Sequence, residues 1–302
     1  MTSPVRRIWL TALVEWRGAL RSRRVLVILA LYLATAVLCM YGTISILGRM
    51  ESELARLLML PDGGQTGIVS ETLWKSESFR RMVRSAVGDS LVFESLLARH
   101  PIELIYAWFA FLFAPMLVIL VSGGRVAADR YTGAVRYMLL RETRLEWSVG
   151  KYFGQALLIA CALLASALGA WAVVLFRLPP PTSTGLLLPM LAWGAKVWVY
   201  SLAWLGVALG VSHLTRASGK AVALGLLFMF LFAVLPGALG LLVEHCNWPQ
   251  SLLRLEAVVP SCAEKALWRS SPASVAGASF HLVALGFLYL MAGAAVFARR
   301  DA

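Results

Sequence analysis

The chain has 302 residues, of which 60% are hydrophobic and 15% are charged, and its formal net charge is +12. Its mean hydropathy is +0.75. Soluble domains carry about 25% charged residues and roughly half apolar ones, so the composition excludes an ordinary soluble enzyme, a disordered chain and a small disulfide-built scaffold. We expect an all-α integral membrane protein, because its long continuous apolar runs suit membrane helices and not alternating strands.

The segment before the first apolar run, residues 6–24, is predicted to form an amphipathic helix. Trp9, Leu13, Trp16 and Leu20 are spaced four, three and four residues apart, which puts them on one helical stripe. The arginines of this segment fall away from that stripe. We interpret it as an interfacial helix with its apolar side toward the membrane; the alternative is a cytoplasmic extension of the first span.

Six apolar runs are long enough to cross the hydrocarbon core, which takes roughly 20 helical residues. They cover 25–47, 104–121, 152–176, 187–211, 221–243 and 275–297. The first run is too long for the core of a signal peptide, so we expect it to be retained. The sequence thus predicts a single transmembrane domain over 1–302, with six membrane helices, an N-terminal interfacial helix and a helical extracytoplasmic segment between the first two spans.

The charges orient these spans. The N-terminal segment, the 122–151 and 212–220 loops and the C-terminus together hold 16 Lys and Arg against 5 Asp and Glu. The segments on the opposite side are balanced, with 11 of each sign. Since cytoplasmic loops carry the basic excess, both termini are predicted in the cytoplasm and the protein in a bacterial inner membrane. The basic loops suit anionic lipid head groups and do not form a nucleic-acid footprint.

The largest segment outside the spans is 48–103. Residues 51–60 read as a helix that continues the first span, and Pro61-Asp62-Gly63-Gly64 ends it. One or two amphipathic helices are expected over 71–100. The segment is either a lid over the spans or a docking surface for an extracytoplasmic accessory protein, and the sequence leaves both open.

The last outer segment, 244–274, contains Cys246 and Cys262. A bacterial periplasm oxidises exposed thiol pairs, and a disulfide between them would stabilise the fold by roughly 3 kcal/mol in the chain-entropy model. The alternative is two free thiols. Neither a CxxC nor an HxxxH spacing accompanies them, so we expect no metal site.

Motifs for catalysis are missing from the sequence. It contains no GxxxxGK[ST] phosphate loop, no HExxH and no GxSxG. We therefore expect no enzyme activity, no catalytic residue and no cofactor in this chain. The six span cores also lack an aspartate or glutamate, the usual mark of an ion-coupled transporter. If the protein uses energy, we expect another protein to supply it.

One charged residue, Lys196, falls within a predicted span. A lysine near the membrane interface can extend its ammonium to the head groups, and here Trp193 and Trp198 would accompany it. If the span begins earlier, Lys196 lies deeper and could line a path for an anionic substrate. The sequence leaves both positions open.

The 122–151 loop carries a recognisable pattern. In order it contains Asp129-Arg130, Gly133, Leu139-Leu140, Arg144 and Gly150-Lys151. This resembles the type-2 permease family, the membrane-spanning subunits of type V-like ATP-binding-cassette (ABC) exporters. The loop departs from the family pattern where Asp129 replaces Glu, where Ala134 replaces Thr, and where Glu142-Thr143 stands in place of a proline.

The resemblance implies that a short helix in this loop inserts into a groove of a separate cytoplasmic ATPase, which binds ATP and magnesium. Val135, Met138 and Leu139 would fill the groove. Arginines would meet acidic residues at its rim, and Gly133 would permit a sharp bend. The implied coupling residues are Asp129, Arg130, Gly133, Arg136, Met138, Leu139 and Arg144, with Arg141 a further rim residue.

We further expect a pair of permeases, such as a homodimer, working with two ATPase chains, because a substrate path needs a surface shared between bundles. The resemblance implies that ATP hydrolysis would drive export or extraction of an amphipathic substrate, for example a lipid-linked compound or a peptide. Two alternatives remain open. Hydrolysis could instead move the outer segments and regulate an extracytoplasmic partner without translocation, or the chain could be a membrane scaffold with no energy source.

Overall fold

The computed structural model describes residues 3–57, 77, 81, 90–140, 142–180, 182–245 and 249–300. These residues form helices and no strand. Six helices are long and apolar enough to span a membrane: Arg23–Met50, Pro101–Thr132, Arg144–Arg177, Thr182–Ser212, Ser218–Val243 and Pro272–Arg299. The prediction of an all-α membrane protein with six spans is confirmed.

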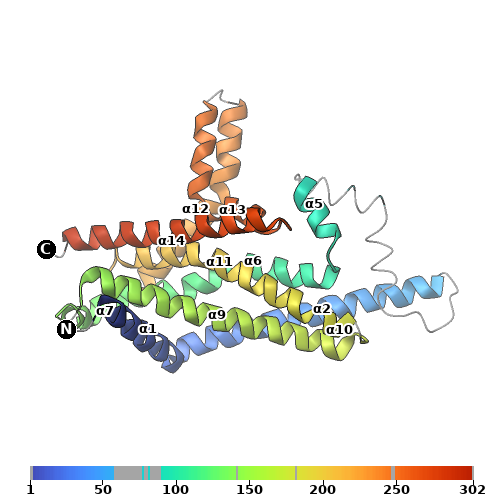
Figure 1. Ribbon diagram of the computed structural model, residues 1–302, viewed down its shortest axis with the longest axis horizontal. Coiled ribbons are helices and arrows are strands. Elements are labelled where there is room, and N and C mark those ends of the chain that lie inside the picture. Colours follow the sequence, from blue (N-terminus) through green and yellow to red (C-terminus); the bar gives the residue numbers. More distant parts are fainter. Residues whose placement is uncertain are drawn as a thin grey trace.

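The N-terminal segment forms the separate helix α1 (Pro4–Arg21), which ends at Ser22, where the backbone is extended. Helix α2 (Arg23–Leu57) follows at an angle to it (Figure 1). Because α2 continues to Leu57, the predicted helical extension of the first span is confirmed that far. The placement of α1 in the membrane interface stays a prediction. In the remainder of the outer segment, the structure describes α5 (Ser90–Leu97).

The spans pack around one central helix. Helix α11 (Leu187–Ser212), reached through the short α10 (Thr182–Gly185), contacts α6 (Pro101–Ser122), α9 (Arg144–Arg177) and α14 (Pro272–Arg300). These helices lie side by side along the long axis of the molecule (Figure 1). The closest approach is between α11 and α14, where a Cβ at Gly206 or Gly210 would overlap the backbone of α14. This glycine pair therefore packs helices within one chain.

Helix α12 (Ser218–His245) begins against α6, where Gly225 lies next to Ile119. Its later part and the 3₁₀ helix η1 (Gln250–Val258) form a hairpin that projects from the bundle (Figure 1, orange). Helix α13 (Pro260–Leu267) follows at the base of this hairpin and packs against α14. Cys262 lies in α13. Cys246 falls outside the described residues, so the predicted disulfide stays a prediction.

Candidate coupling site

The loop between the second and third spans folds as two short helices. Helix α7 (Arg125–Thr132) continues from α6, and α8 (Ala134–Met138) follows after a turn. Gly133 forms this turn with φ 75°, a left-handed conformation that favours glycine. The structure therefore contains both the bend at Gly133 and the short helix that the sequence indicates.

The start of α9 is fixed by a capping box. The Thr143 hydroxyl accepts a hydrogen bond from the backbone N–H of Glu146 (3.2 Å), and the Thr143 N–H donates to the Glu146 carboxylate (2.9 Å). Helix α1 adds two contacts: Arg7 pairs with Glu146 at 2.7 Å, and the Thr11 hydroxyl donates to Glu142 at 2.7 Å. The Glu142-Thr143 pair that replaces the family's proline thus caps the third span and binds α1.

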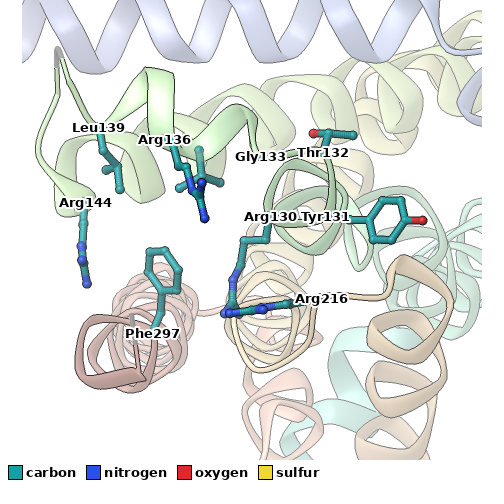
Figure 2. Close-up of a pocket in the computed structure, with 10 residues that line it drawn as sticks. Arg130, Tyr131, Thr132, Gly133, Arg136, Leu139, Arg144, Arg216 and Phe297 are labelled. Atoms are coloured by element: carbon teal, nitrogen blue, oxygen red, sulfur yellow. The ribbon is translucent and has the colours of Figure 1, made fainter. Parts of the chain in front are cut away.

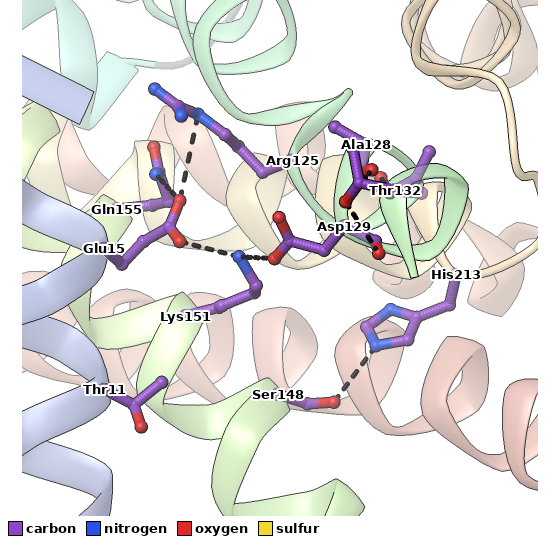
Figure 3. A network of polar contacts seen from close by, with 12 residues as sticks. Thr11, Glu15, Arg125, Ala128, Asp129, Thr132, Ser148, Lys151, Gln155 and His213 are labelled. Carbon is purple, nitrogen blue, oxygen red and sulfur yellow. Dashed lines mark hydrogen bonds and ion pairs between the residues drawn. The ribbon is translucent and has the colours of Figure 1, made fainter. Parts of the chain in front are cut away.

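A buried ionic network joins α1, α7 and α9 (Figure 3). Lys151 of α9 has only 4% of its side chain exposed, and its Nζ lies 2.6 Å from a carboxylate oxygen of Glu15 and 2.6 Å from one of Asp129. Glu15 also accepts a hydrogen bond from Gln155 at 2.7 Å and faces Arg125 at 3.8 Å. We call these five residues the Lys151 network. Its two cations balance its two carboxylates, as burial of charge requires.

The charges of the Lys151 network hold Glu15 ionised. Burial by itself would raise the pKa of the Glu15 carboxyl, but the ammonium of Lys151 and the guanidinium of Arg125 outweigh burial and keep that pKa below its ordinary value. Glu15 therefore stays a carboxylate at neutral pH. Because its partners come from two other helices, α1 is bound firmly to the base of the third span and to the 122–151 loop, which we call the coupling loop.

A neutral histidine lies at the junction of α11 and α12. A carbonyl can only accept, so His213 Nδ1 carries the proton and donates to Leu209 (2.7 Å), while Nε2 accepts from the Ser148 hydroxyl (3.0 Å). Burial lowers the pKa of His213 to about 4. Arg130 of α7 donates to the backbone carbonyls of His213 and Thr215. The coupling loop is thereby bound to the α11–α12 junction.

A basic pocket of about 740 Å³ opens beside α7 and α8 (Figure 2). Arg130, Arg136 and Arg144 of the coupling loop line it together with Arg216 of the α11–α12 loop. At its wall, Phe297 of α14 lies under two of these guanidinium groups, with ring centroid distances of 4.7 Å to Arg130 and 5.3 Å to Arg144. Arg144 also donates to the Ala298 carbonyl. The C-terminal end of α14 is thus part of the site.

The structure divides the predicted coupling residues into two groups. Asp129, Arg130 and Arg144 contact other parts of the same chain, and these contacts hold the loop in place. Arg136 and Met138 are exposed on α8 and remain available to a partner. Gly133 forms the turn between the two groups. Arg141, a predicted rim residue, lies outside the described residues.

The predicted apolar side of α8 needs a correction. Val135 is 6% exposed and packs into the chain's own core, so it does not face a partner's groove. Leu139 is half-buried against the same core. The exposed apolar side chains are instead Tyr137 (77%) and Leu140 (82%). Helix α8 therefore presents Tyr137 and Leu140, and not Val135, on its outer face, because Val135 anchors the helix to the bundle.

Several functional residues are missing from the sequence-based prediction. Glu15 lies within the amphipathic pattern of α1, and its role depends on partners more than 100 residues away. Gln155, His213, Arg216 and Phe297 come from three further segments. The one local signal was the Gly150-Lys151 pair at the start of the third span, which contains the central lysine of the network.

Lys196 lies in α11 at the opposite end of the bundle. Its ammonium donates to the carbonyl of Leu267 at the end of α13 (2.7 Å) and lies 4.3 Å from the centroid of the Trp193 ring. These contacts favour the interpretation in which Lys196 is held beside Trp193 at the outer end of the span. A role in a substrate path stays a prediction.

The six candidate spans define a multi-pass membrane protein. The family model described as ABC-2 family transporter protein matches residues 9–302, and the chain belongs to this family. The resemblance seen in the 122–151 loop is thereby confirmed, and the chain is a membrane-spanning permease subunit of an ABC transporter. A search of curated proteins found no match.

Proposed function

We propose that this permease couples ATP hydrolysis by a separate ATPase chain to export or extraction of an amphipathic substrate. The ATPase docks on α8 and on the rim of the basic pocket, and it binds the ATP and magnesium. The observation that carries this proposal is the Lys151 network, because it links the loop that would receive the ATPase to the third span and to α1. The setting we infer is a bacterial inner membrane with both termini in the cytoplasm.

The proposed docking surface consists of Arg136, Tyr137, Met138 and Leu140. All four side chains are exposed and lie on or next to α8. Tyr, Met and Arg are the residue types enriched in the cores of protein interfaces. The arginines of the adjoining pocket add positive charge, which favours an acidic partner surface.

Movement of the docked ATPase would reach the membrane through rigid elements. A push on α8 passes to α7, and the Asp129–Lys151 ion pair passes it to α9. Helix α9 has 34 residues, which corresponds to about 51 Å at about 1.5 Å per residue. It therefore carries a displacement at its base across the whole membrane, as in rigid-body switching transitions.

The working complex that we propose contains two copies of this chain and two ATPase chains. Helix α12 offers an apolar surface for this pairing, where Leu227, Phe230 and Leu231 are exposed. A second permease bundle would cover this face and enclose a path between the two bundles. Native mass spectrometry of the complex in mild detergent would give the stoichiometry, and a single permease copy would contradict it.

Charge reversal within the docking surface tests the coupling directly. Arg136→Glu should reduce copurification of the ATPase at least tenfold, whereas Arg17→Glu, the same change on the exposed face of α1, should leave it unchanged. The measurement is quantitative mass spectrometry of proteins that coelute from native membranes. Equal ATPase recovery with both variants would refute docking on α8.

A second function is supported by α2. This continuous helix of 35 residues runs for about 52 Å from the junction with α1 to Leu57, beyond the span that ends at Met50. It is suited to carrying motion to an extracytoplasmic partner with no substrate crossing. Purified complex in liposomes separates the two: stimulation of ATPase activity by that partner without translocation of any lipid or peptide would favour mechanotransmission.

A further inference from the structure

A second cavity, separate from the coupling site, lies among α6, α11, α12 and α13. Its volume is about 280 Å³. The helices contribute Trp108 and Phe111 from α6, Tyr200 and Trp204 from α11, Met229 from α12, and Glu264 from α13. Its lining is therefore mainly aromatic and apolar, and the segment that we predict to be extracytoplasmic adds Ser261 and the carboxylate of Glu264.

The inner wall of this cavity is a packed aromatic cluster. The Phe111 ring centroid lies 5.4 Å from that of Tyr200 and 5.1 Å from that of Trp268, and Tyr200 lies 6.3 Å from Trp204. Phe111, Tyr200 and Trp204 are buried. Such mutually supported rings form a rigid wall, so a ligand would find the site preformed.

The outer rim opens sideways. Trp108 is 59% exposed, and Leu112, one turn along α6, is exposed as well. Both belong to a membrane-spanning helix, so this rim faces the hydrocarbon of the bilayer and not the aqueous phase. A ligand with an apolar tail could keep the tail in the lipid while its head enters the cavity.

Glu264 sets the charge of the ligand. Among the described residues that line the cavity it is the one ionisable acid, and its carboxylate accepts a hydrogen bond from the Trp268 indole N–H (3.2 Å). Burial raises the pKa of Glu264, although the Trp268 indole, the Tyr200 hydroxyl and the charge of Lys265 act in the opposite direction. A cation in the cavity would stabilise the carboxylate further, whereas an anionic head group would be repelled.

We propose that this cavity binds the head of a lipophilic organic cation, such as a quaternary ammonium or phosphonium group. Glu264 provides the counter-charge, and the faces of Trp108, Phe111 and Tyr200 provide cation–π contacts. The inference deepens the proposed function, since it rests on that function for the idea that the bound cation is the substrate. Binding itself requires this chain alone.

The test uses the full chain purified into phosphatidylglycerol nanodiscs without any ATPase. Tritiated tetraphenylphosphonium is the probe, because it is permanently charged, and tetraphenylborate is its anion of matching shape. We expect saturable binding of the cation above that of empty nanodiscs. Glu264→Gln should weaken it about tenfold or more, the effect of losing one charged partner, while Glu94→Gln on the exposed face of α5 should leave it unchanged.

Trp108→Leu is a second variant that keeps the test decisive if Glu264→Gln does not fold. This exposed rim residue can change with little effect on packing, and loss of one aromatic face should weaken binding about three- to tenfold. Binding that does not saturate, that is equal in the wild type and the folded variants, or that tetraphenylborate shows equally when it is assayed on its own, would overturn the proposal.

The same assay can distinguish between two sources of the cation, a membrane lipid and a free organic cation. Phosphatidylethanolamine added to the nanodiscs supplies a lipid ammonium head. Competition by this lipid would identify a membrane lipid as the occupant, and its absence would favour a free organic cation; both results support the same head-group chemistry. If no ATPase copurifies with the chain and the cation still binds, the proposed coupling to an ATPase is refuted, whereas the proposed cation-binding cavity is not.

Discussion

The two ends of this bundle are held together by different interactions. At the coupling end, helices far apart in the sequence are joined by ion pairs, with Lys151 of α9 between Glu15 of α1 and Asp129 of α7. At the opposite end, α6, α11 and the end of α13 are joined by aromatic rings that pack in T-shaped and tilted pairs around Phe111. Charged contacts dominate the first end and apolar contacts the second.

This difference suits the tasks that we assign to the two ends. Ion pairs with fixed geometry have directional preferences and resist sliding, so they transmit the displacement of a docked partner. Aromatic faces tolerate ligands of varied shape, and a single carboxylate then selects by charge. The comparison predicts that substitutions in the Lys151 network affect stability and coupling together, whereas substitutions near Phe111 affect ligand binding first.

The largest effect is expected from Lys151→Met. The change leaves Glu15, with 12% of its side chain exposed, and the partly exposed Asp129 without their shared cation. Removal of one partner of a buried ion pair typically costs about 3–5 kcal/mol in the free energy of unfolding. Thermal unfolding in detergent should show the loss, and α1 should become sensitive to protease. Lys265→Met on the exposed side of α13 is the matched control. A similar small change in both variants would mean that the network does not hold α1.

Acid should destabilise the coupling end through His213. Below pH ~6.5 the unfolded chain binds a proton at this histidine, while the folded chain resists it down to about pH 4. Stability should therefore fall by up to about 3 kcal/mol as the pH drops through this window. His213→Gln should flatten the dependence, and His245→Gln at an exposed position should not. Melting temperatures of the wild type and both variants, measured across this pH window, would test the predicted loss of stability.

A smaller effect is expected at the bend of the coupling loop. Gly133 has φ 75°, and a β-branched residue there should cost about 1–2 kcal/mol of local stability. Gly133→Val should therefore misplace α8 and reduce ATPase copurification severalfold. Gly133→Asn should retain most of it, since asparagine tolerates this conformation. Unchanged recovery with valine would show that the angle between α7 and α8 does not matter for docking.

The smallest effect is expected from Lys196→Met. The ammonium would lose its hydrogen bond to Leu267 and its contact with the Trp193 ring, together worth about 1 kcal/mol. Stability should change little, and transport should continue. A selective loss of transport with normal stability and expression would instead place Lys196 in the substrate path.

The spans of this protein follow directly from its sequence. A run of roughly 20 apolar residues can hydrogen-bond all its backbone N–H and C=O groups within the membrane by forming a helix. All six spans were therefore predicted, as was the helical continuation of α2 toward Leu57. The bend at Gly133 was also expected, because the family resemblance of the 122–151 loop places this glycine where the chain turns into a short helix.

The contacts that build the site could not be predicted in the same way. Glu15 and Lys151 are separated by 136 positions, and no local pattern pairs them. Val135 has the spacing of a partner-facing residue, yet it is buried, because the choice between facing the core and facing outward depends on where α7 places the start of α8. Tertiary packing decided both outcomes.

Crosslinking from Tyr137 tests the central claim most directly. This exposed residue of α8 lies in the proposed docking surface and outside the Lys151 network. A photoreactive phenylalanine analogue at this position, activated in native membranes, should form a covalent adduct with an ABC ATPase, while the same analogue at Trp9 of α1 should not. Adducts from Tyr137 that contain lipid or unrelated proteins, but no ATPase, would contradict the account.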